Sequence, residues 1–192
     1  MEYRKTNYVI TIKTSGAKDI KGMYYRHCIG TTNPRTFSTL TIKTTNPKAT
    51  IIIFSTGNIT VMGCDTKWGV FYTLHQLRTL YPELIYTDIK ITNVVAKFEL
   101  PKRDITKVFH DNIQRCICNL DIFPSCSYHV PNTSVKANFF NSGKMILVGC
   151  TDDDMIKEIM EKDKNNLNKY FIIGLVVLVV IVISINIVMC II

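Results

Sequence analysis

The chain has 192 residues and a formal net charge of +8, and every charged residue lies before position 171. This balance suits an anionic partner, either nucleic acid or an acidic membrane surface, although many basic proteins bind neither. The seven cysteines include no C-x-x-C pair. This argues against a zinc site or a disulfide framework and favours reduced, partly buried thiols. No cofactor is indicated.

The first 84 residues predict a strand, a partly helical section, a second strand, a hairpin and a closing helix. Alternating apolar and polar residues define the strands, and a glycine in the hairpin provides the positive φ that a tight turn needs. Asp65 and Thr66 are suitable caps for the helix. In chain order the elements are residues 7–14, 17–27, 37–44, the turn Thr56-Gly57, and a helix that presents Trp68, Phe71, Tyr72, Leu74, Leu77 and Leu80.

Residues 85–162 predict the same order of elements. The closing helix is shorter here, and the carboxylates at its start complement the helix dipole. In chain order the elements are a strand at 89–100, a partly helical section at 104–117, a strand at 125–130, the turn Ser142-Gly143, and a helix at 152–162 with Met155, Ile156, Ile159 and Met160 apolar.

The C-terminal residues predict a membrane anchor. A polar, basic linker at 163–170 precedes the uncharged apolar run 171–192. As a helix this run is about 33 Å long, enough to cross a hydrocarbon core of about 30 Å. The chain shows no N-terminal signal peptide, and basic residues beside a span favour the cytoplasmic side. We therefore expect a single-pass, tail-anchored protein whose folded part faces cytosol or nucleoplasm, on a host or viral membrane.

An internal repeat relates the two halves of the chain. When the sequence is shifted by 86 residues, Asn7 falls on Asn93 and Val9 on Val95, and one register holds without a gap. Further matches are Thr6 with Thr92, Asn33 with Asn119, Phe37 with Phe123, Phe54 with Phe140, Gly57 with Gly143, Gly63 with Gly149 and Cys64 with Cys150. Two copies of one supersecondary unit explain this pattern. They predict an antiparallel sheet with helices on one face and the other face open.

Four short segments resemble motifs of the TATA-box-binding protein family. They are N-P-x-x-F at 33–37, a hairpin of the I-F-x-S-G-K type at 53–58 and again at 139–144, and an E-L-F-P-like segment at 121–124. The spacing of 17 residues from Phe37 to Phe54 recurs from Phe123 to Phe140, which makes the resemblance specific. It covers roughly residues 5–160. It implies an α+β saddle of two repeats, with a continuous antiparallel sheet and helices on the convex face, followed here by one transmembrane helix.

The resemblance implies a DNA-binding transcription initiation factor that bends A·T-rich DNA. In that family two phenylalanines per half wedge between base steps of the minor groove. The matching positions are Phe37, Phe54, Phe123 and Phe140. Residues of the groove floor match Asn7, Val9, Ile52, Asn93 and Val95. From the sequence alone, the phenylalanines could instead be core residues of alternating strands, but the register of a saddle places them on its open face and favours the wedge interpretation. For the two asparagines, a role on the groove floor and an incidental position are equally open.

Other family positions are matched only in part. Arg35, Lys43 and Lys144 match residues that bind phosphates, and Asp121 matches a position that contacts a partner similar to transcription factor IIB. Met62 and Val148 replace threonines of the groove floor, and Asn138 replaces an aliphatic residue. The basic family positions that are not basic here hold Thr36, Asn58, Asp65, His129 and Thr151. Fewer phosphate contacts weaken DNA binding and its salt dependence.

Two functions therefore remain open. One is a membrane-tethered initiation factor, and the other is the same fold reused as a membrane-anchored protein-interaction module without DNA binding. An enzyme is disfavoured, because the four histidines have no metal-ligand spacing and the chain has no phosphate-cradling loop or nucleophile motif. The composition, rich in Asn, Ile and Lys, suits a large DNA virus or a protist with an A·T-rich genome.

Overall fold

The computed structural model describes residues 2–15, 19–100 and 104–162. The chain divides into two compact units, residues 1–152 and 153–192, and the described part of the second is the helix α4 (Asp153–Lys162). The predicted linker at 163–170 and the predicted span at 171–192 lie outside the described residues. Among the helices that are described, none is both long and apolar enough to cross a membrane.

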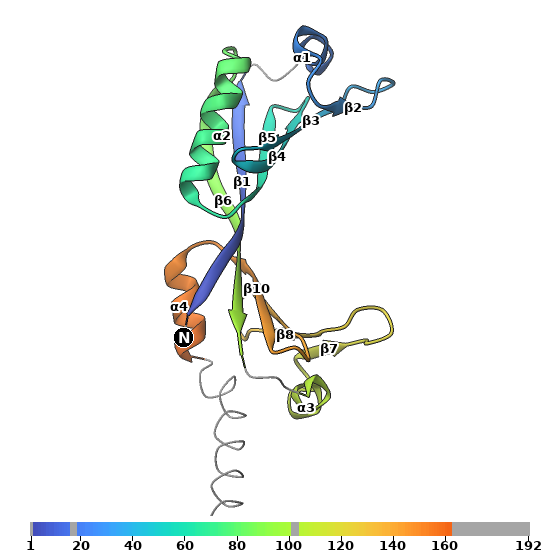
Figure 1. Cartoon of the computed structure of the whole chain (residues 1–192), viewed down its shortest axis with the longest axis vertical. Coiled ribbons are helices and arrows are strands. Elements are labelled where there is room, and N and C mark those ends of the chain that lie inside the picture. Colours follow the sequence, from blue (N-terminus) through green and yellow to red (C-terminus); the bar gives the residue numbers. More distant parts are fainter. Residues whose placement is uncertain (1, 16–18, 101–103, 163–192) are drawn as a thin grey trace, which may run out of the picture. The chain divides into compact units, whose positions relative to one another are not determined.

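A single antiparallel sheet of ten strands forms the first unit (Figure 1). The strand order is β2-β3-β4-β5-β1-β6-β10-β9-β8-β7, so the two central strands are the first strands of the two repeats. The first repeat contains β1 (Tyr3–Ser15), α1 (Ile20–His27), β2 (Thr31–Thr32), β3 (Thr39–Thr45), β4 (Lys48–Phe54), β5 (Asn58–Cys64) and α2 (Lys67–Leu80). The second contains β6 (Ile85–Glu99), α3 (Ile105–Asp111), β7 (Cys116–Cys118), β8 (Cys126–His129), β9 (Lys136–Phe139) and β10 (Lys144–Cys150), with α4 after it.

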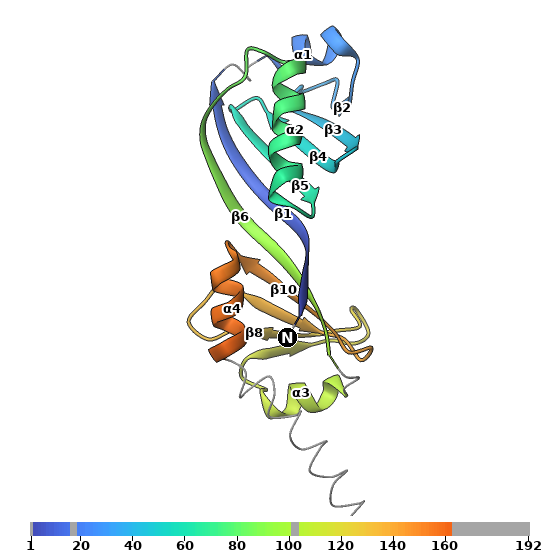
Figure 2. The same ribbon diagram turned by 60° about the vertical axis from the view of Figure 1, so that its left-hand side comes forward.

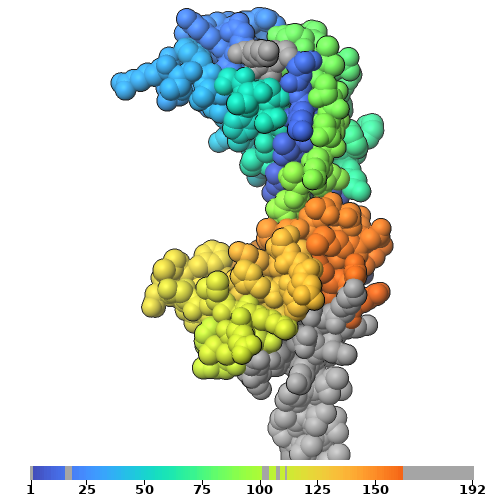
Figure 3. Space-filling model, turned by 180° about the vertical axis from the view of Figure 1, so that it is seen from behind, coloured from blue at the N-terminus to red at the C-terminus, as the bar shows by residue number. Residues whose placement is uncertain are grey.

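The two repeats meet along the β1–β6 ladder, whose strands run side by side through the molecule (Figure 3). Tyr8 pairs with Val94, which is its own equivalent 86 residues later. Asn7 pairs with Val95, and Val9 pairs with Asn93. Exchanging each residue for its equivalent in the other repeat turns the first pair into the second. A pseudo-twofold axis therefore passes through the Tyr8–Val94 pair.

Alternation along each strand separates a core face from an open face. On β1 the side chains of Tyr8, Ile10 and Ile12 are at most 3% exposed, and the residues between them are not buried. The helix α2 covers the core face of the first repeat (Figure 2). Its buried apolar residues are Val70, Leu74 and Leu77. The strand order, the alternation and the covering helix α2 agree with the α+β fold that the sequence predicts.

The helix predicted after Thr66 is present as α2, but its six predicted apolar residues do not share one face. Leu74 and Leu77 are buried, whereas Trp68, Phe71 and Tyr72 are 77%, 55% and 44% exposed. The apolar residues of α2 form two stripes, and the sheet packs against the stripe that contains Val70. The section at 104–117 is partly helical, as expected: α3 ends at Asp111, and Cys116–Cys118 pairs with β8 as a strand.

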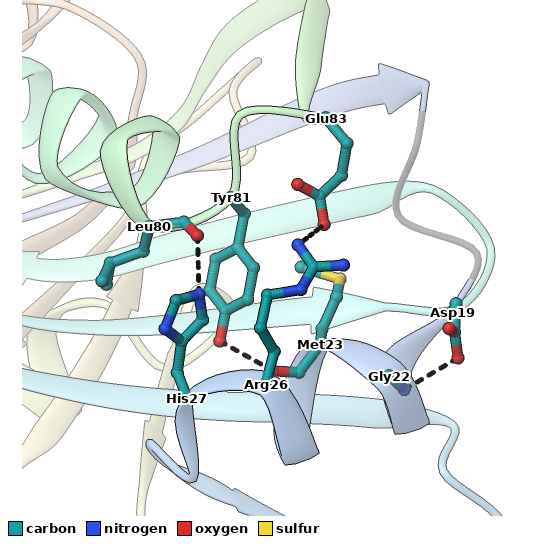
Figure 4. Close-up of polar contacts among 8 residues, drawn as sticks. All are labelled: Asp19, Gly22, Met23, Arg26, His27, Leu80, Tyr81 and Glu83. Carbon is teal, nitrogen blue, oxygen red and sulfur yellow. Dashed lines mark hydrogen bonds and ion pairs between the residues drawn. The ribbon is translucent and has the colours of Figure 1, made fainter.

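The short helix α1 is attached to the C-terminal end of α2 by polar contacts (Figure 4). The hydroxyl of Tyr81, a residue that is fully buried, donates to the carbonyl oxygen of Met23 at 3.3 Å. His27 donates from Nε2 to the carbonyl oxygen of Leu80 at 2.8 Å, and Arg26 forms a 2.7 Å ion pair with Glu83. Burial raises the pKa of Tyr81, which keeps its hydroxyl protonated as a donor. These contacts fix α1 beside the loop that carries Phe37.

We predict that Tyr81→Phe lowers the free energy of unfolding by about 1 kcal/mol, the usual net value of one hydrogen bond, and leaves the fold intact. The carbonyl oxygen of Met23 then loses its donor in a buried environment. Chemical denaturation followed by circular dichroism measures the change. Tyr25→Phe is the matched control, because Tyr25 is 58% exposed and its hydroxyl makes no buried contact. Equal stability of the two variants would contradict the assigned role of Tyr81.

Candidate nucleic-acid interface

The open face of the sheet is defined by the residues that alternate with the core. At its centre, Asn7 and Val9 of β1 lie beside Val95 and Asn93 of β6, around the pseudo-twofold axis. Further half-buried side chains of this face are Thr60 and Met62 on β5, Thr50 and Ile52 on β4, Ile146 and Val148 on β10, and Asn138 on β9. The face thus combines apolar and polar side chains, and the amides of Asn7 and Asn93 are the polar groups at its centre.

Each central asparagine accepts a hydrogen bond from a glycine on the neighbouring strand. The N–H of Gly63 donates to Oδ1 of Asn7 at 2.7 Å, and the N–H of Gly149 donates to Oδ1 of Asn93 at 2.8 Å. A backbone N–H can pair only with the oxygen end of the amide, so these contacts fix how each side chain is turned. The NH₂ group of each asparagine remains as a donor for another acceptor. We call each of these contacts an Asn–Gly clamp.

A bulge in each repeat creates the donor that its clamp uses. Beside β1 the pairing passes from Val9–Met62 to Tyr8–Cys64, which leaves Gly63 without a ladder partner. Gly63 has φ +100° and Gly149 has φ +102°, a conformation that favours glycine. The unpaired N–H of each glycine needs an acceptor, and the asparagine supplies it.

Two repeated turns hold the four phenylalanines at the edges of the sheet. Phe37 donates its backbone N–H to the carbonyl oxygen of Asn33 at 2.8 Å, and Phe123 does the same to Asn119 at 3.0 Å. In the hairpins, Gly57 donates to the carbonyl oxygen of Phe54 and Gly143 donates to that of Phe140. None of the four is a fully buried core residue; Phe123 is 56% exposed.

The two phenylalanine pairs differ in their contacts. The rings of Phe123 and Phe140 meet edge to face, with centroids 5.9 Å apart. The ring centroid of Phe37 instead lies 6.1 Å from that of Tyr25 on α1, and the ammonium group of Lys21 lies 5.9 Å from the ring centroid of Phe37. Phe37 also has φ +43°, an uncommon conformation for a bulky residue, which Phe123 does not share. The repeat symmetry therefore does not extend to the ring contacts.

The three predicted phosphate-binding residues, Arg35, Lys43 and Lys144, are all exposed. The open face also carries cations that the sequence analysis missed, among them Lys97 on β6 and Lys136 on β9. Lys97 continues the alternation from Asn93 and Val95, so counting every second residue along β6 would have identified it. Lys97 donates to Glu99 at 2.9 Å, and this hydrogen bond lowers the pKa of the Glu99 carboxyl.

The departures from the family pattern also lie on accessible parts of the sheet or its loops. Met62 pairs with Val9 and Val148 pairs with Lys136, so both bring apolar surface to the open face. Asn138 lies there between Ser127 and Ile146. Asp121 and the five non-basic residues at basic family positions are exposed.

The described cysteines are free thiols, and four of them, Cys64, Cys116, Cys126 and Cys150, are buried. Burial raises the pKa of Cys150 to about 11, which keeps this thiol protonated at neutral pH. Within the described residues, no group of three or more His, Cys, Asp or Glu side chains is arranged to hold a metal ion.

The sequence is similar to that of proteins of known name. The family model described as "Transcription factor TFIID (or TATA-binding protein, TBP)" matches residues 2–79 and 88–170. The TATA-box-binding protein of Tetrahymena thermophila is 25% identical over 161 residues, which cover 81% of this chain and 65% of that protein. That of Methanothermobacter thermautotrophicus is 27% identical over 140 residues, which cover 70% of this chain and 77% of the relative. The chain thus spans just under two thirds of the Tetrahymena protein.

The fold has a counterpart among solved structures. Methanococcus jannaschii TBP superposes with a TM-score of 0.75 over 88% of this chain and 99% of that structure, at 19% sequence identity. At this identity the superposition establishes the fold alone. The family model covers both repeats, and the two repeats meet in one ten-stranded sheet about a pseudo-twofold axis. The chain therefore belongs to the TATA-binding protein family.

Proposed function

We propose that this chain is a DNA-binding transcription initiation factor whose open sheet face binds the minor groove of A·T-rich duplexes. The pair of Asn–Gly clamps carries this proposal. On the floor of the minor groove an A·T pair presents only acceptors, whereas a G·C pair adds a donor. The clamps leave two amide NH₂ donors beside the pseudo-twofold axis, which complements a row of acceptors. The names of the family and of the relatives agree with this function.

The phenylalanines supply the deformation that this mode of binding requires. Wedges inserted between base steps unstack them and kink the duplex toward the major groove, so that more protein surface contacts DNA. Phe123 and Phe140 are accessible as one edge-to-face pair. Phe37 must leave its contact with Tyr25 before it can insert beside Phe54. The apolar surface around Ile52 then packs against the sugars of the opened groove.

Cations around the open face support the same proposal. Arg35, Lys43 and Lys144 are exposed, and Lys136 adds a cation beside Val148. We expect the affinity for DNA to fall less steeply with rising salt concentration than that of a protein with more phosphate contacts, because fewer counterions are released. Asp121 is exposed in the loop before β8, where it is available to a partner similar to transcription factor IIB.

We also propose that residues 171–192 anchor the protein in a membrane, with the folded part in cytosol or nucleoplasm. The support is the uncharged apolar sequence of this run and the lysines that precede it. A composition rich in Asn, Ile and Lys is consistent with a source that has an A·T-rich genome, such as a large DNA virus or a protist.

A second candidate function is supported by three residues of the open face. Met62 and Val148 cannot donate hydrogen bonds to the groove floor, and Asn138 puts an amide where an apolar contact is expected. These features favour a protein-interaction module on the same fold. A correctly folded protein that binds neither an A·T-rich nor a G·C-rich duplex would exclude the first function and leave a membrane-anchored protein-interaction module as the candidate.

Replacement of Phe123 and Phe140 by Ala should remove roughly half of the DNA bend, since one of the two kinks is lost. Energy transfer between dyes at the ends of an A·T-rich duplex measures the bend, with a G·C-rich duplex beside it. Phe71→Ala is the matched control: Phe71 is 55% exposed but lies on α2, away from the open face. Unchanged bending by the double variant would refute the wedge assignment.

The clamps predict an unusual separation of stability from binding. Asn7→Asp and Asn93→Asp retain an oxygen for the N–H of Gly63 or Gly149 but lose the outward NH₂ donors. Each change should weaken binding to an A·T-rich duplex by about 1–3 kcal/mol, or roughly 5- to 150-fold. The midpoint of thermal unfolding should stay within a few degrees of the parent protein. Asn7→Ala, which removes both functions, should lower both affinity and stability; equal affinity of the Asp variants and the parent would exclude amide readout.

The anchor is tested by flotation with preformed liposomes followed by an alkaline carbonate wash. The full chain should float with the lipid after the wash, because 171–192 spans the bilayer. A chain that ends at residue 162 should remain at the bottom of the gradient. Loss of the full chain from lipid on washing would show that the run does not insert.

A further inference from the structure

The outward face of α2 carries a stripe of large aromatic side chains. Trp68, Phe71 and Tyr72 are 77%, 55% and 44% exposed, and His75 one turn further on is also exposed. Residues three and four positions apart are neighbours on a helix, so these four side chains form one continuous surface. We call Trp68, Phe71, Tyr72 and His75 the aromatic stripe.

The fold does not require the aromatic stripe. The helix is capped by Thr66, whose side chain accepts from the N–H of Gly69, and it packs through Val70, Leu74 and Leu77. Large apolar groups in water cost about 25 cal/mol per Å² relative to burial. A solvated helix face would therefore be expected to hold polar residues instead.

The second repeat shows what such a solvated face looks like. In the register of 86 residues, buried Val70 corresponds to buried Ile156, so the buried apolar position is retained in α4. The exposed positions differ in kind. Trp68 corresponds to Asp154, Phe71 to Lys157, Tyr72 to Glu158 and His75 to Glu161. The aromatic residues are thus particular to α2 and point to a partner that covers it.

The charge of α2 indicates the chemistry of that partner. Its sequence, KWGVFYTLHQLRTL, contains no Asp or Glu, and exposed Lys67 and Arg78 stand near its two ends. A helix face with aromatic residues at its centre and cations around them is typical of contact with the headgroup region of an anionic bilayer. Trp and Tyr are the residues that this region favours, because their rings are apolar with one polar group.

A membrane is favoured over a protein partner by the position of the apolar run. The linker 163–170 has eight residues and spans at most about 28 Å when fully extended. The end of α4 therefore stays within that distance of the membrane surface. Tethering raises the effective concentration of lipid at the folded part, so even a weak interfacial contact becomes populated.

We propose that the aromatic stripe of α2, flanked by Lys67 and Arg78, lies in the headgroup region of an anionic membrane. This inference rests on the membrane attachment proposed above. In the first repeat, α2 and the open face lie on opposite sides of the sheet (Figure 2). Contact of α2 with lipid therefore leaves the Asn–Gly clamps accessible to DNA.

The chain supplies its own probe, because Trp68 is its single tryptophan. The full chain is inserted into preformed vesicles of phosphatidylcholine with or without phosphatidylserine, and tryptophan emission is excited selectively. In the anionic vesicles the emission of Trp68 should shift to shorter wavelength, resist acrylamide and be quenched by lipids brominated near the headgroup. Lys67→Gln and Arg78→Gln should each weaken this contact about fivefold, and high salt should have the same effect.

A variant with both Phe71→Ser and Tyr72→Ser should restore quenching of Trp68 by acrylamide while flotation stays complete. Ile117→Ser is the matched control, because Ile117 is 65% exposed but lies on the strand β7 and not on α2. Its change should leave Trp68 protected. Trp68 that remains open to acrylamide on vesicles that carry the anchored chain would overturn the lipid contact alone. Failure of the chain to float would overturn the attachment itself, so the two results are distinguishable.

Discussion

The β1–β6 ladder determines where every residue of the open face lies. Because Tyr8 pairs with its own repeat equivalent Val94, the two halves of the chain are related by rotation about that pair. Each backbone position on the open face of one half then has an equivalent position in the other half, related by this axis. Asn7 and Asn93 lie near the axis because they are one residue from Tyr8 and Val94. A shift of this ladder by one residue would turn both asparagines into the core.

Each clamp pairs a backbone N–H and at the same time orients the NH₂ group of an asparagine. A bulged glycine leaves an N–H that must be paired, and the short side chain of asparagine reaches it from the adjacent strand with only its oxygen. The nitrogen end is then oriented without any further contact. An amide that is already oriented loses less side-chain entropy when it binds. Since Met62 and Val148 add no polar groups beside it, the free energy of DNA binding in the proposed complex has to come mainly from the wedges and from the ease with which the duplex deforms.

The features that follow from local sequence could be predicted, and those that depend on tertiary packing could not. Alternation located β1 and β6, and the glycines of the hairpins adopt the expected positive φ, +92° at Gly57 and +84° at Gly143. The buried side of α2 could not be predicted, because this helix has two apolar stripes with the same spacing, and only packing against the sheet decides between them. The contact between Asn7 and Gly63 joins residues far apart in the chain, so no local pattern reveals it.

The two proposals assign DNA to one face of the first repeat and a membrane to the other, and the distance between the faces limits how the two partners interact. DNA phosphates and anionic headgroups repel one another, which would oppose DNA binding close to a membrane. A helix with its side chains is about 10–12 Å across, so in the proposed arrangement α2 and the sheet keep the duplex and the lipid more than one Debye length, about 8 Å at physiological ionic strength, apart in the surrounding solution. The part of this repulsion that acts through the salt solution is therefore largely screened. Exposed Lys67 on α2 and exposed Lys43 on β3 each add a positive charge toward one of the two proposed anionic partners.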